Sequence, residues 1–351
     1  MYIAEMKKII PQTYPADYIA DRMYPVEVYG SRINKTAQRL AKKIGVEYRA
    51  SVLDFDLYPQ IALATEQDHP KNWGVKMVNS LTTKIHKNEI GFFGIGYNLS
   101  YHLDILPNLA SQIGMASGLD QLDNNEEVPY YGCAVSLYVL EKAKKYCEQS
   151  NRPVIIFIFD QCFTGFPQIK EEDKDFRKLL ISNLLFTDGG IGMLVIPETM
   201  RHRYRKPLIR ITNIETKYAP GSLIRMQDGK FIMSSRTKQV MPKMVSDLLI
   251  KPFLEKRRMA VSEIREWSIH QGGSEVLVRF CDPDTLNLSR EQIERSMQKF
   301  YEYGNTSAAS CLLVLESFFN DPKLPNSSSV HGIILGFGAG YYLGIASYTW
   351  D

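Results

Sequence analysis

The stretch PVIIFIFD, residues 153–160, is an uninterrupted apolar run that ends on an aspartate. A strand that covers one face of a sheet alternates apolar and polar residues, whereas a continuous apolar run is typical of a strand buried on both faces. The chain must therefore place further layers of structure on both sides of at least one sheet. With 351 residues, of which 44% are hydrophobic and 23% charged, it is long enough to build such a core.

Strand and helix patterns alternate along both halves of the chain, which predicts layered α/β structure with buried sheets. The first half is expected to contain a helix at 33–46 that ends at Gly45, strands at 88–99, 153–160 and 186–197, a helix at 108–119, and a strand, a turn and a long helix over 127–149. The second half is expected to contain strands at 208–218, 266–273 and 329–340, a hairpin at 224–235 that turns at Asp228, and helices at 241–257, 288–304 and 307–321. A polar, basic stretch at 198–207 separates the two series, which predicts two halves, 1–200 and 201–351.

Bulk composition excludes several classes of protein. The formal net charge of +3 is too small to predict nucleic-acid binding. The five cysteines form no C-x-x-C pair, so neither a disulfide framework nor a metal site is expected. The N-terminal stretch lacks the apolar core of a secretory signal, and no apolar run reaches the length of a membrane span. We therefore expect a cytoplasmic protein with no membrane partner.

Cys133, in YYGCAVSLY, stands between an expected strand and a long expected helix. The partial positive charge at a helix N-terminus lowers the pKa of a thiol placed there, which favours the nucleophilic thiolate. A single cysteine is more often a small buried hydrophobic residue, and the other four cysteines have no comparable setting. Cys133 is therefore a candidate nucleophile that needs partners elsewhere in the chain.

Two later segments offer such partners. His270 ends an expected strand and is followed by Gly272 and Gly273, and glycines let a backbone pass close to a substrate. Asn305 precedes a run of small residues that opens an expected helix, although an asparagine in this setting is also a common turn or cap residue. A thiol, an imidazole and an amide at three expected strand-to-helix junctions supply a nucleophile, a base and an oxyanion donor.

These segments resemble motifs of the thiolase-fold condensing enzymes, in particular β-ketoacyl-acyl-carrier-protein synthase III and the chalcone-synthase-like type III polyketide synthases. YYGCAVS resembles the nucleophile turn, and LLFTDGGIGMLVI resembles the glycine turn of the first half. HQGG resembles the histidine motif, GNTSAAS the asparagine motif, and GFGAG, at 336–340, the C-terminal glycine loop. The resemblances follow the family order along most of the chain.

The resemblance implies a five-layered αβαβα fold of two similar halves, with the active site between them. Cys133 would hold the acyl chain as a thioester. His270 and Asn305 would bind a thioester carbonyl and stabilise the enolate that forms on decarboxylation. Gly272 and Gly273 would leave room for the extender unit, and the glycine loop would line the substrate pocket at Gly338.

The resemblance also implies how substrates and partners are held. TAQRLAKKIGVEYR is similar to the segment that holds coenzyme A phosphates, with Arg39 and Lys43 at the contact positions; a simply solvated basic helix face is the alternative. Leu106 corresponds to the position that reaches into the neighbouring subunit's pocket of a homodimer. No permanently bound cofactor is implied, and the substrate carries coenzyme A or the phosphopantetheine arm of an acyl carrier protein.

Departures from the family motifs narrow the function. GFGAG has no second cysteine, unlike a degradative thiolase, and Gly273 and Glu275 replace an asparagine and an arginine of synthase III. We therefore expect a ketosynthase that condenses an acyl thioester on Cys133 with a malonyl or β-ketoacyl thioester, in polyketide or other specialised-metabolite biosynthesis. Two alternatives stay open: an acyltransferase that moves the acyl group to an oxygen or nitrogen, and a non-catalytic partner subunit of another ketosynthase.

Overall fold

The computed structural model describes residues 1–101, 106–166, 169–173, 175–227, 229–321 and 330–351. Its strands are β1 (Tyr2–Ile9), β2 (Thr13–Pro15), β3 (Tyr48–Ala50), β4 (Phe92–Tyr97), β5 (Asn124–Pro129), β6 (Val154–Asp160), β7 (Gly189–Ile196), β8 (Ile209–Tyr218), β9 (Ile224–Gln227), β10 (Lys230–Met233), β11 (Ile264–Ile269), β12 (His331–Phe337) and β13 (Tyr342–Trp350). Its α-helices are α1 (Ala16–Met23), α2 (Val26–Ile44), α3 (Pro70–Leu81), α4 (Leu109–Ser117), α5 (Val135–Ser150), α6 (Phe176–Leu185), α7 (Thr237–Val245), α8 (Lys251–Lys256), α9 (Ser274–Arg279), α10 (Arg290–Tyr303) and α11 (Ser310–Phe319).

One mixed sheet of nine strands runs in the order β11-β12-β13-β8-β1-β7-β6-β4-β5. It has two parts, because β1 and β4 to β7 come from the first half of the chain and β8 and β11 to β13 from the second. The two parts meet along β1 and β8, where Tyr2 pairs with Arg210 and Ile3 with Ile209. This short junction lets the two parts diverge and lie face to face.

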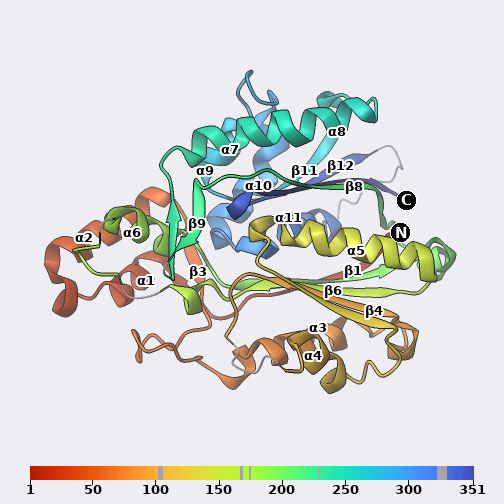
Figure 1. The fold of residues 1–351 in the computed structure, drawn as a ribbon, viewed down its shortest axis with the longest axis horizontal. Coiled ribbons are helices and arrows are strands. Elements are labelled where there is room, and N and C mark those ends of the chain that lie inside the picture. Colours follow the sequence, from red (N-terminus) through yellow and green to blue (C-terminus); the bar gives the residue numbers. More distant parts are fainter. Residues whose placement is uncertain (102–105, 167–168, 174, 228, 322–329) are drawn as a thin grey trace.

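Helices fill the space between the two parts of the sheet and cover its outer faces. Figure 1 shows α5 and α11 between the parts, α7 and α8 above one part, and α3 and α4 below the other. The succession helix, sheet, helix, sheet, helix confirms the five-layered arrangement that the sequence predicts. The chain passes from one part of the sheet to the other through a short 3₁₀ segment, Glu198–Arg203. The division into halves at residues 200 and 201 stays a prediction.

Strand β6 shows why the apolar run of this segment is unbroken. All of its residues are buried, and alternate residues enter two different cores. Phe157 packs in the cluster that contains Trp73 of α3, whereas Ile156 packs in the cluster that contains Leu137 of α5 and Leu312 of α11. The strand keeps its period of two residues, and both of its faces meet apolar layers.

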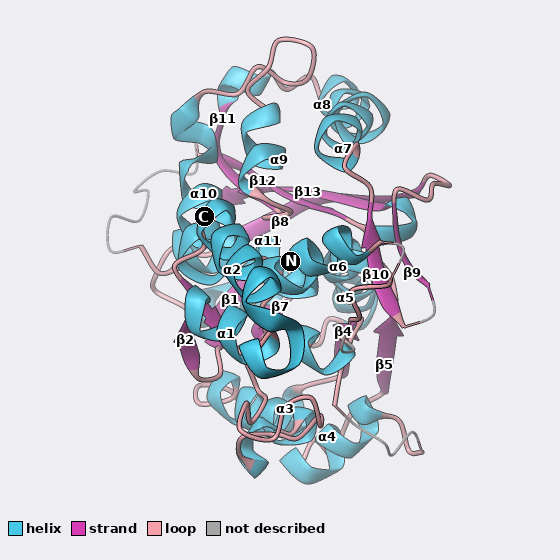
Figure 2. Cartoon of the chain, turned by 90° about the vertical axis from the view of Figure 1, so that its left-hand side faces the viewer, coloured by secondary structure: helices cyan, strands magenta, loops and turns pink. Residues whose placement is uncertain are grey.

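A separate hairpin, β9 and β10, stands beside α6 and apart from the main sheet, as Figure 2 shows. Phe231 pairs with Met226 across the hairpin, and its ring packs edge to face on Phe186 with the ring centroids 4.9 Å apart. The hairpin itself is confirmed, although Asp228 of its predicted turn lies outside the described residues.

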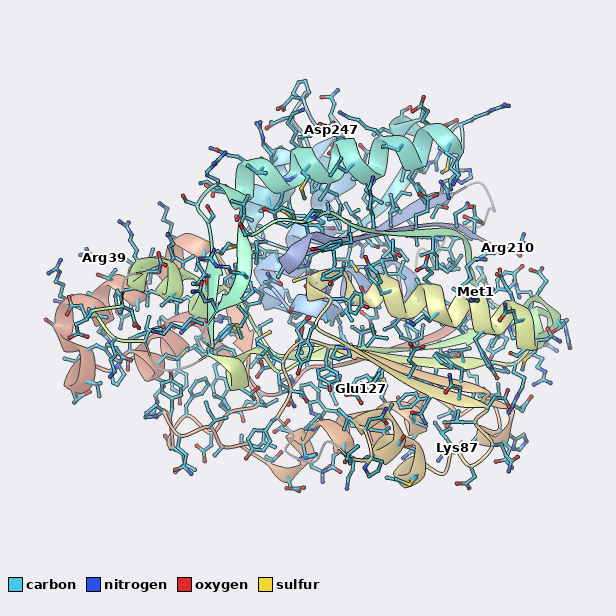
Figure 3. All side chains as sticks on the ribbon, in the orientation of Figure 1. Met1, Arg39, Lys87, Glu127, Arg210 and Asp247 are labelled. Carbon is cyan, nitrogen blue, oxygen red and sulfur yellow. The ribbon has the colours of Figure 1, made fainter. Side chains whose placement is uncertain are left out.

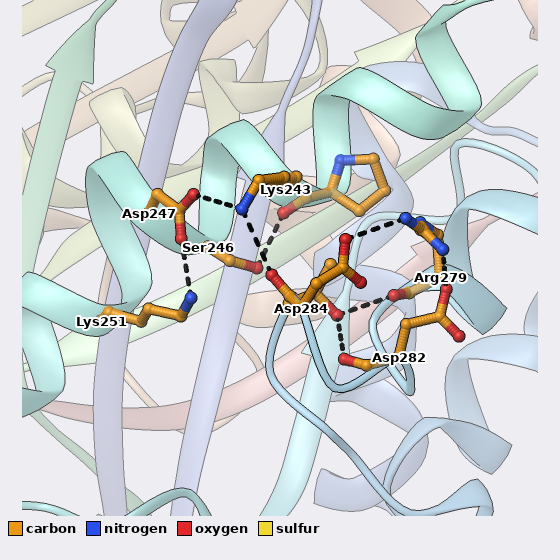
Figure 4. A network of polar contacts seen from close by, with 9 residues as sticks. Lys243, Ser246, Asp247, Lys251, Arg279, Asp282 and Asp284 are labelled. Atoms are coloured by element: carbon orange, nitrogen blue, oxygen red, sulfur yellow. Dashed lines mark hydrogen bonds and ion pairs between the residues drawn. The ribbon is translucent and has the colours of Figure 1, made fainter.

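The outermost helices α7 and α8 run on through a π-helical turn at Ser246–Ile250. Lys243 and Lys251 both form ion pairs with Asp247, and Lys243 also reaches the carbonyl of Asp284 (Figure 4). The charged groups of these two ion pairs are exposed, so each pair contributes only about 0–1 kcal/mol to the free energy of unfolding. The network ties the outer helices to the loop after α9, and the buried layers supply most of the stability.

Several predicted elements have different ends in the structure. Gly45 caps α2 in the left-handed conformation, as expected. Gly30 has a non-helical φ of 74° and kinks α2, so the part that runs unbroken to Gly45 begins after Gly30, close to the predicted residue 33. The helix predicted at 241–257 begins at Thr237 and contains the π-helical turn. The sequence patterns do not predict β1, α3, α6 or β13.

Candidate active site

One cavity of about 450 Å³, called here the main cavity, brings the three predicted catalytic residues together. Cys133, His270 and Asn305 all line it, and so do Gly272 and Gly338. Much of the remaining wall is apolar and includes Leu99, Phe166, Phe186, Ile224, Met226, Phe231, Met233, Met241 and Phe337.

Cys133 lies on a 3₁₀ turn, Gly132–Ala134, that leads directly into α5. Its side chain is buried, and burial raises the pKa of the thiol to about 12. Loss of hydration on burial thus opposes the effect expected of the helix N-terminus, which stays a prediction.

The C-terminal glycine loop packs directly on this nucleophile turn. A β-carbon placed on Gly338 would lie 2.3 Å from the backbone nitrogen of Cys133, and one placed on Gly132 would lie 2.7 Å from that of Ala339. Neither distance is possible for a real side chain, so glycine at both positions allows the two segments to touch. The predicted pocket role of Gly338 thus has a steric basis.

His270 directly follows β11, and its backbone N–H donates to the carbonyl of Leu335 at 2.9 Å. Burial lowers the pKa of the imidazole to about 3, so the ring is neutral near pH 7. Among the described residues, Nδ1 has no hydrogen-bond partner. A β-carbon on Gly272 would lie 3.4 Å from Nε2, so this glycine leaves space around that nitrogen. A neutral ring protonated on Nε2 would donate a hydrogen bond to a substrate in this space.

Asn305 lies between α10 and α11, which corrects the expectation that it follows a strand. A parallel bridge to Phe186 and a bond from the N–H of Thr187 to its carbonyl hold its backbone. Its side-chain Oδ1 accepts hydrogen bonds from the N–H of Ser307, at 2.9 Å, and the hydroxyl of Ser310, at 3.4 Å. Because the oxygen is used in this way, the amide NH₂ is the group left to donate to a ligand.

Comparison with known proteins adds sequence relatives. Residues 254–350 match the family model "3-Oxoacyl-[acyl-carrier-protein (ACP)] synthase III C terminal". The chain is 26% identical over 243 residues to type III polyketide synthase B of Arabidopsis thaliana, a match that covers 64% of this chain and 60% of that protein. It is 30% identical over 179 residues to β-ketoacyl-[acyl-carrier-protein] synthase III of Lactococcus lactis, which covers 46% of this chain and 51% of that protein. The matches thus span less than two thirds of these relatives.

Solved structures match the fold over its whole length. The 1,3,6,8-tetrahydroxynaphthalene synthase of Streptomyces coelicolor A3(2), a bacterial type III polyketide synthase, has a TM-score of 0.81 and 15% identity, over 100% of this chain and 99% of that chain. The chain has the thiolase-like fold of this enzyme. The C-terminal type III polyketide synthase domain of Steely1 from Dictyostelium is a second condensing enzyme of this fold, with a TM-score of 0.77 and 15% identity over 99% of this chain and 98% of that chain.

The other predicted site residues lie in the second cavity or on the surface. Gly272 lines both the main cavity and a neighbouring cavity of about 370 Å³, called here the second cavity, whereas Gly273 and Lys43 line only the second. Arg39 is exposed on α2 at the edge of the molecule and does not line the second cavity (Figure 3). Leu106 is 86% exposed and lines neither cavity.

The structure adds residues that the sequence patterns do not single out. Ser307, two residues after Asn305, contacts the nucleophile, and the motif GNTSAAS already contains it. Asp160 ends the buried strand β6, and a carboxylate at the end of an apolar run is a readable signal for a buried charge. Arg177 and Lys238 line the second cavity from α6 and α7, and nothing in the sequence links these two distant cations.

The described residues contain neither a membrane-spanning helix nor a metal-binding cluster. In that part of the chain, no helix is both long and apolar enough to cross a membrane. Within the same residues, no three side chains of His, Cys, Asp or Glu are grouped so that they could hold a metal ion.

Acidification is expected to destabilise the protein through His270. The unfolded chain binds a proton on this imidazole below about pH 6.5, whereas the native ring, with its pKa lowered to about 3, stays neutral. The unfolded state then binds more protons, so the free energy of unfolding falls as the pH drops from about 6.5 toward 3, by up to ~1.4 kcal/mol per pH unit. Urea unfolding at pH 7, 6 and 5 should show a shallower fall for His270→Gln. His202→Gln, at an exposed histidine, should keep the wild-type slope; equal slopes in all three proteins would contradict this role of His270.

Proposed function

We propose that this chain is a ketosynthase that joins two acyl thioesters by a Claisen condensation, in polyketide or other specialised-metabolite biosynthesis. The observation that carries the proposal is the convergence of Cys133, His270 and Asn305 on the main cavity. A thiol that holds the first acyl group beside two hydrogen-bond donors is the arrangement that carbon–carbon bond formation needs. The names of the curated relatives, a polyketide synthase and a β-ketoacyl synthase, support the same reaction class.

Each residue has a distinct part in the proposed reaction. The sulfur of Cys133 attacks the carbonyl of an acyl thioester and keeps the acyl group while the first thiol leaves. Nε2–H of His270 and the amide NH₂ of Asn305 then donate to the carbonyl oxygen of the second thioester. Negative charge grows on that oxygen as a malonyl group loses carbon dioxide, so fixed donors stabilise the transition state more than the ground state. The resulting carbanion attacks the acyl group on the sulfur.

The wall of the main cavity supports an apolar starter. Phe166, Phe186 and Phe231 supply aromatic surface, and Met226 and Met241 supply flexible side chains that adapt to a chain of varying shape. Each methylene group buried in such a cavity contributes roughly 0.8 kcal/mol to binding. The affinity for acyl thioesters is therefore expected to rise with acyl length until the cavity is full.

The second cavity supports binding of the thioester's handle. Lys43, Arg177, Lys178 and Lys238 line it, and its wall shares Gly272 with the main cavity. Lys178 is paired with Asp175 and Lys238 with Glu275, at 2.6 and 2.7 Å. Among the described residues, Lys43 and Arg177 make no ion pair. We propose that these two bind the phosphates of coenzyme A, or the phosphate of a carrier protein's phosphopantetheine arm.

Removal of either free cation should weaken substrate binding without changing the chemistry. Lys43→Ala and Arg177→Ala are each expected to raise KM for a coenzyme A thioester about 3- to 10-fold with kcat unchanged, because a charge-assisted contact to phosphate is lost. Arg39→Ala should raise KM by a smaller factor, since its side chain acts from the exposed side of α2. Steady-state kinetics at low salt measures the effect, with Lys35→Ala on the same helix as the control. An unchanged KM in both Lys43→Ala and Arg177→Ala would assign them to the solvated surface.

We also propose a homodimer. β5 is an edge strand of the main sheet, and a free edge is a template for a second copy of the same chain. Three strongly exposed apolar side chains flank this region in sequence: Leu106, Met115 and Tyr130, at 86%, 65% and 71% exposure. Burial in an interface would remove them from water, and Leu106 would enter the partner's cavity. Light scattering at micromolar concentration should give a dimer, and a monomer there would refute this proposal.

A further inference from the structure

The hydroxyl of Ser307 lies beside the nucleophile. Its Oγ is 3.6 Å from Sγ of Cys133, and either atom can be the donor. The backbone of Ser307 has a φ of +50°, in the left-handed region that serine rarely adopts. The bond from its N–H to Oδ1 of Asn305 holds this conformation. A strained turn that is fixed in this way directs a side chain at one target, which here is the thiol.

The carboxylate of Asp160 lies beneath the same turn. It accepts hydrogen bonds from the backbone N–H groups of Asn98, Leu99 and Ala308, at 2.6, 2.7 and 3.0 Å, and from the side chain of Asn98 at 2.9 Å. Burial raises the pKa of this carboxyl, and hydrogen bonds from these groups and from the hydroxyl of Ser307 oppose the rise. The carboxylate is thus fully buried and rigidly held next to the turn of Ser307. The side-chain NH₂ of Asn98, which donates to this carboxylate, also lies 3.5 Å from the hydroxyl oxygen of Ser307 that contacts Cys133.

Acylation of Cys133 needs a group that takes the thiol proton. A proton moved to His270 would create a thiolate and an imidazolium together in a buried site, and each would lose its hydration. The lowered pKa of the buried imidazole reflects the same penalty. Transfer of the proton to Asp160 instead neutralises the carboxylate and leaves one negative charge on the sulfur. The site then holds a single charge before and after the transfer.

We propose that Ser307 and Asp160 form a proton relay for Cys133. The thiol S–H bond breaks as its proton passes to the oxygen of Ser307, and the original hydroxyl proton passes to a carboxylate oxygen of Asp160. The thiolate then attacks the acyl thioester, and the leaving thiolate receives the proton by the reverse path. The net charge of the site is constant in each step, and His270 stays neutral as a donor for the second thioester. The relay rests on the proposed function in making Cys133 the acylated residue.

Other ionisable groups surround the relay. Those that face Cys133 or Asp160, or act on them electrostatically, are His270, Cys311, Cys162, Tyr97 and Asp188, with Arg49 beyond Asp188. Arg49 is the cation among them. It lowers the pKa of Asp188 and is not among the groups that shift the pKa of Asp160. The carboxylate therefore remains an available proton acceptor.

The relay predicts a distinctive pH profile for alkylation of Cys133 by iodoacetamide. The relay has two states: a Cys133 thiol with an Asp160 carboxylate, and a Cys133 thiolate with an Asp160 carboxylic acid. Both states contain the same number of protons, so the fraction of thiolate that the relay supplies does not depend on pH. The logarithm of the wild-type rate should be nearly flat from pH 6 to 8. In Asp160→Asn no carboxylate accepts the proton, and the rate should rise about tenfold per pH unit. Ser307→Ala should react about tenfold more slowly at pH 6, because the thiolate loses a hydrogen bond, and its profile should steepen.

Matched variants separate the relay from direct proton transfer to His270. His270→Ala should keep the flat pH profile of alkylation. If His270 were instead the base for the thiol, the profile would become steep in His270→Ala and stay flat in Asp160→Asn. Ser136→Ala is the control, since its hydroxyl lies 3.3 Å from the buried thiol of Cys311 and should not affect Cys133. Peptide mass spectrometry reports alkylation of Cys133, and thermal unfolding checks each fold.

Each result bears on one claim. If Asp160→Asn does not fold, Ser307→Ala serves as the test of the relay. A flat pH profile of Cys133 alkylation with an unchanged rate in Ser307→Ala would overturn the relay. A steep wild-type profile would overturn it as well. Alkylation needs no acyl donor, so failure of condensation with the predicted alkylation profiles would refute the proposed function and leave the relay intact.

Discussion

Cys133→Ala should abolish acylation of the protein while the fold stays intact. The thiol is the group that would accept the acyl chain, and the side chain loses only its sulfur, so little else in the cavity changes. Intact mass spectrometry after incubation with an acyl thioester should show the wild-type protein heavier by one acyl group. The alanine variant should show no adduct, a loss of at least about 10³-fold in the rate of acylation.

A second cavity cysteine supplies the control for this result. Cys162 also lines the main cavity and is fully buried, and burial raises the pKa of its thiol well above the usual range. It lies at the start of a 3₁₀ turn after β6, on a different element from Cys133, and the hydroxyl of Ser307 contacts the thiol of Cys133. Cys162→Ala should therefore keep the acyl adduct. An adduct that persists in Cys133→Ala and disappears in Cys162→Ala would show that Cys162 is the nucleophile.

His270→Ala and Asn305→Ala should separate the two stages of the reaction. Both variants keep the thiol, so the acyl adduct on Cys133 should still form. Asn305→Ala also removes the acceptor that holds the turn of Ser307, so its adduct should form more slowly than that of His270→Ala. Each loses a donor to the carbonyl of the second thioester, and removal of one oxyanion donor typically slows the chemical step by about 10²- to 10³-fold. Release of carbon dioxide from a malonyl thioester, measured beside acyl-adduct formation, should fall by that factor.

Conservative variants test the assigned roles further. His270→Gln keeps an N–H donor and should recover part of the rate that His270→Ala loses. Asn305→Asp replaces the amide NH₂ with an acceptor that repels a developing oxyanion, so it should be slower than Asn305→Ala. Loss of acylation in His270→Ala would instead make this residue the base for Cys133.

The layers of the fold are readable from the sequence because burial leaves a pattern. The apolar run of β6 has both faces in contact with core clusters, and it predicts a sheet covered on both sides. Gly45 marks the end of α2 because the left-handed cap favours glycine. α3 has buried residues at helical spacing, among them Trp73, Met77 and Leu81, so its signal is local and readable although no helix is expected there.

The candidate site follows a similar division. The sequence predicts that Cys133, His270 and Asn305 share one cavity, and the structure confirms this. It does not predict the raised pKa of the thiol, because the depth of burial depends on how the glycine loop at Gly338 packs on the nucleophile turn. The contact of Ser307 with the thiol is unreadable for the same reason, since it joins elements that are distant in the chain.

The most direct test of the central claim follows carbon from a labelled extender. The protein is incubated with a panel of acyl thioesters and with ¹³C-labelled malonyl-coenzyme A, and adducts and products are followed by mass spectrometry. We expect an acyl adduct on Cys133, release of carbon dioxide, and a product in which labelled extender carbon is bonded to the starter acyl group. An acyl adduct that forms and then moves to an oxygen or nitrogen acceptor, with no labelled carbon in any product, would contradict condensation and establish acyl transfer.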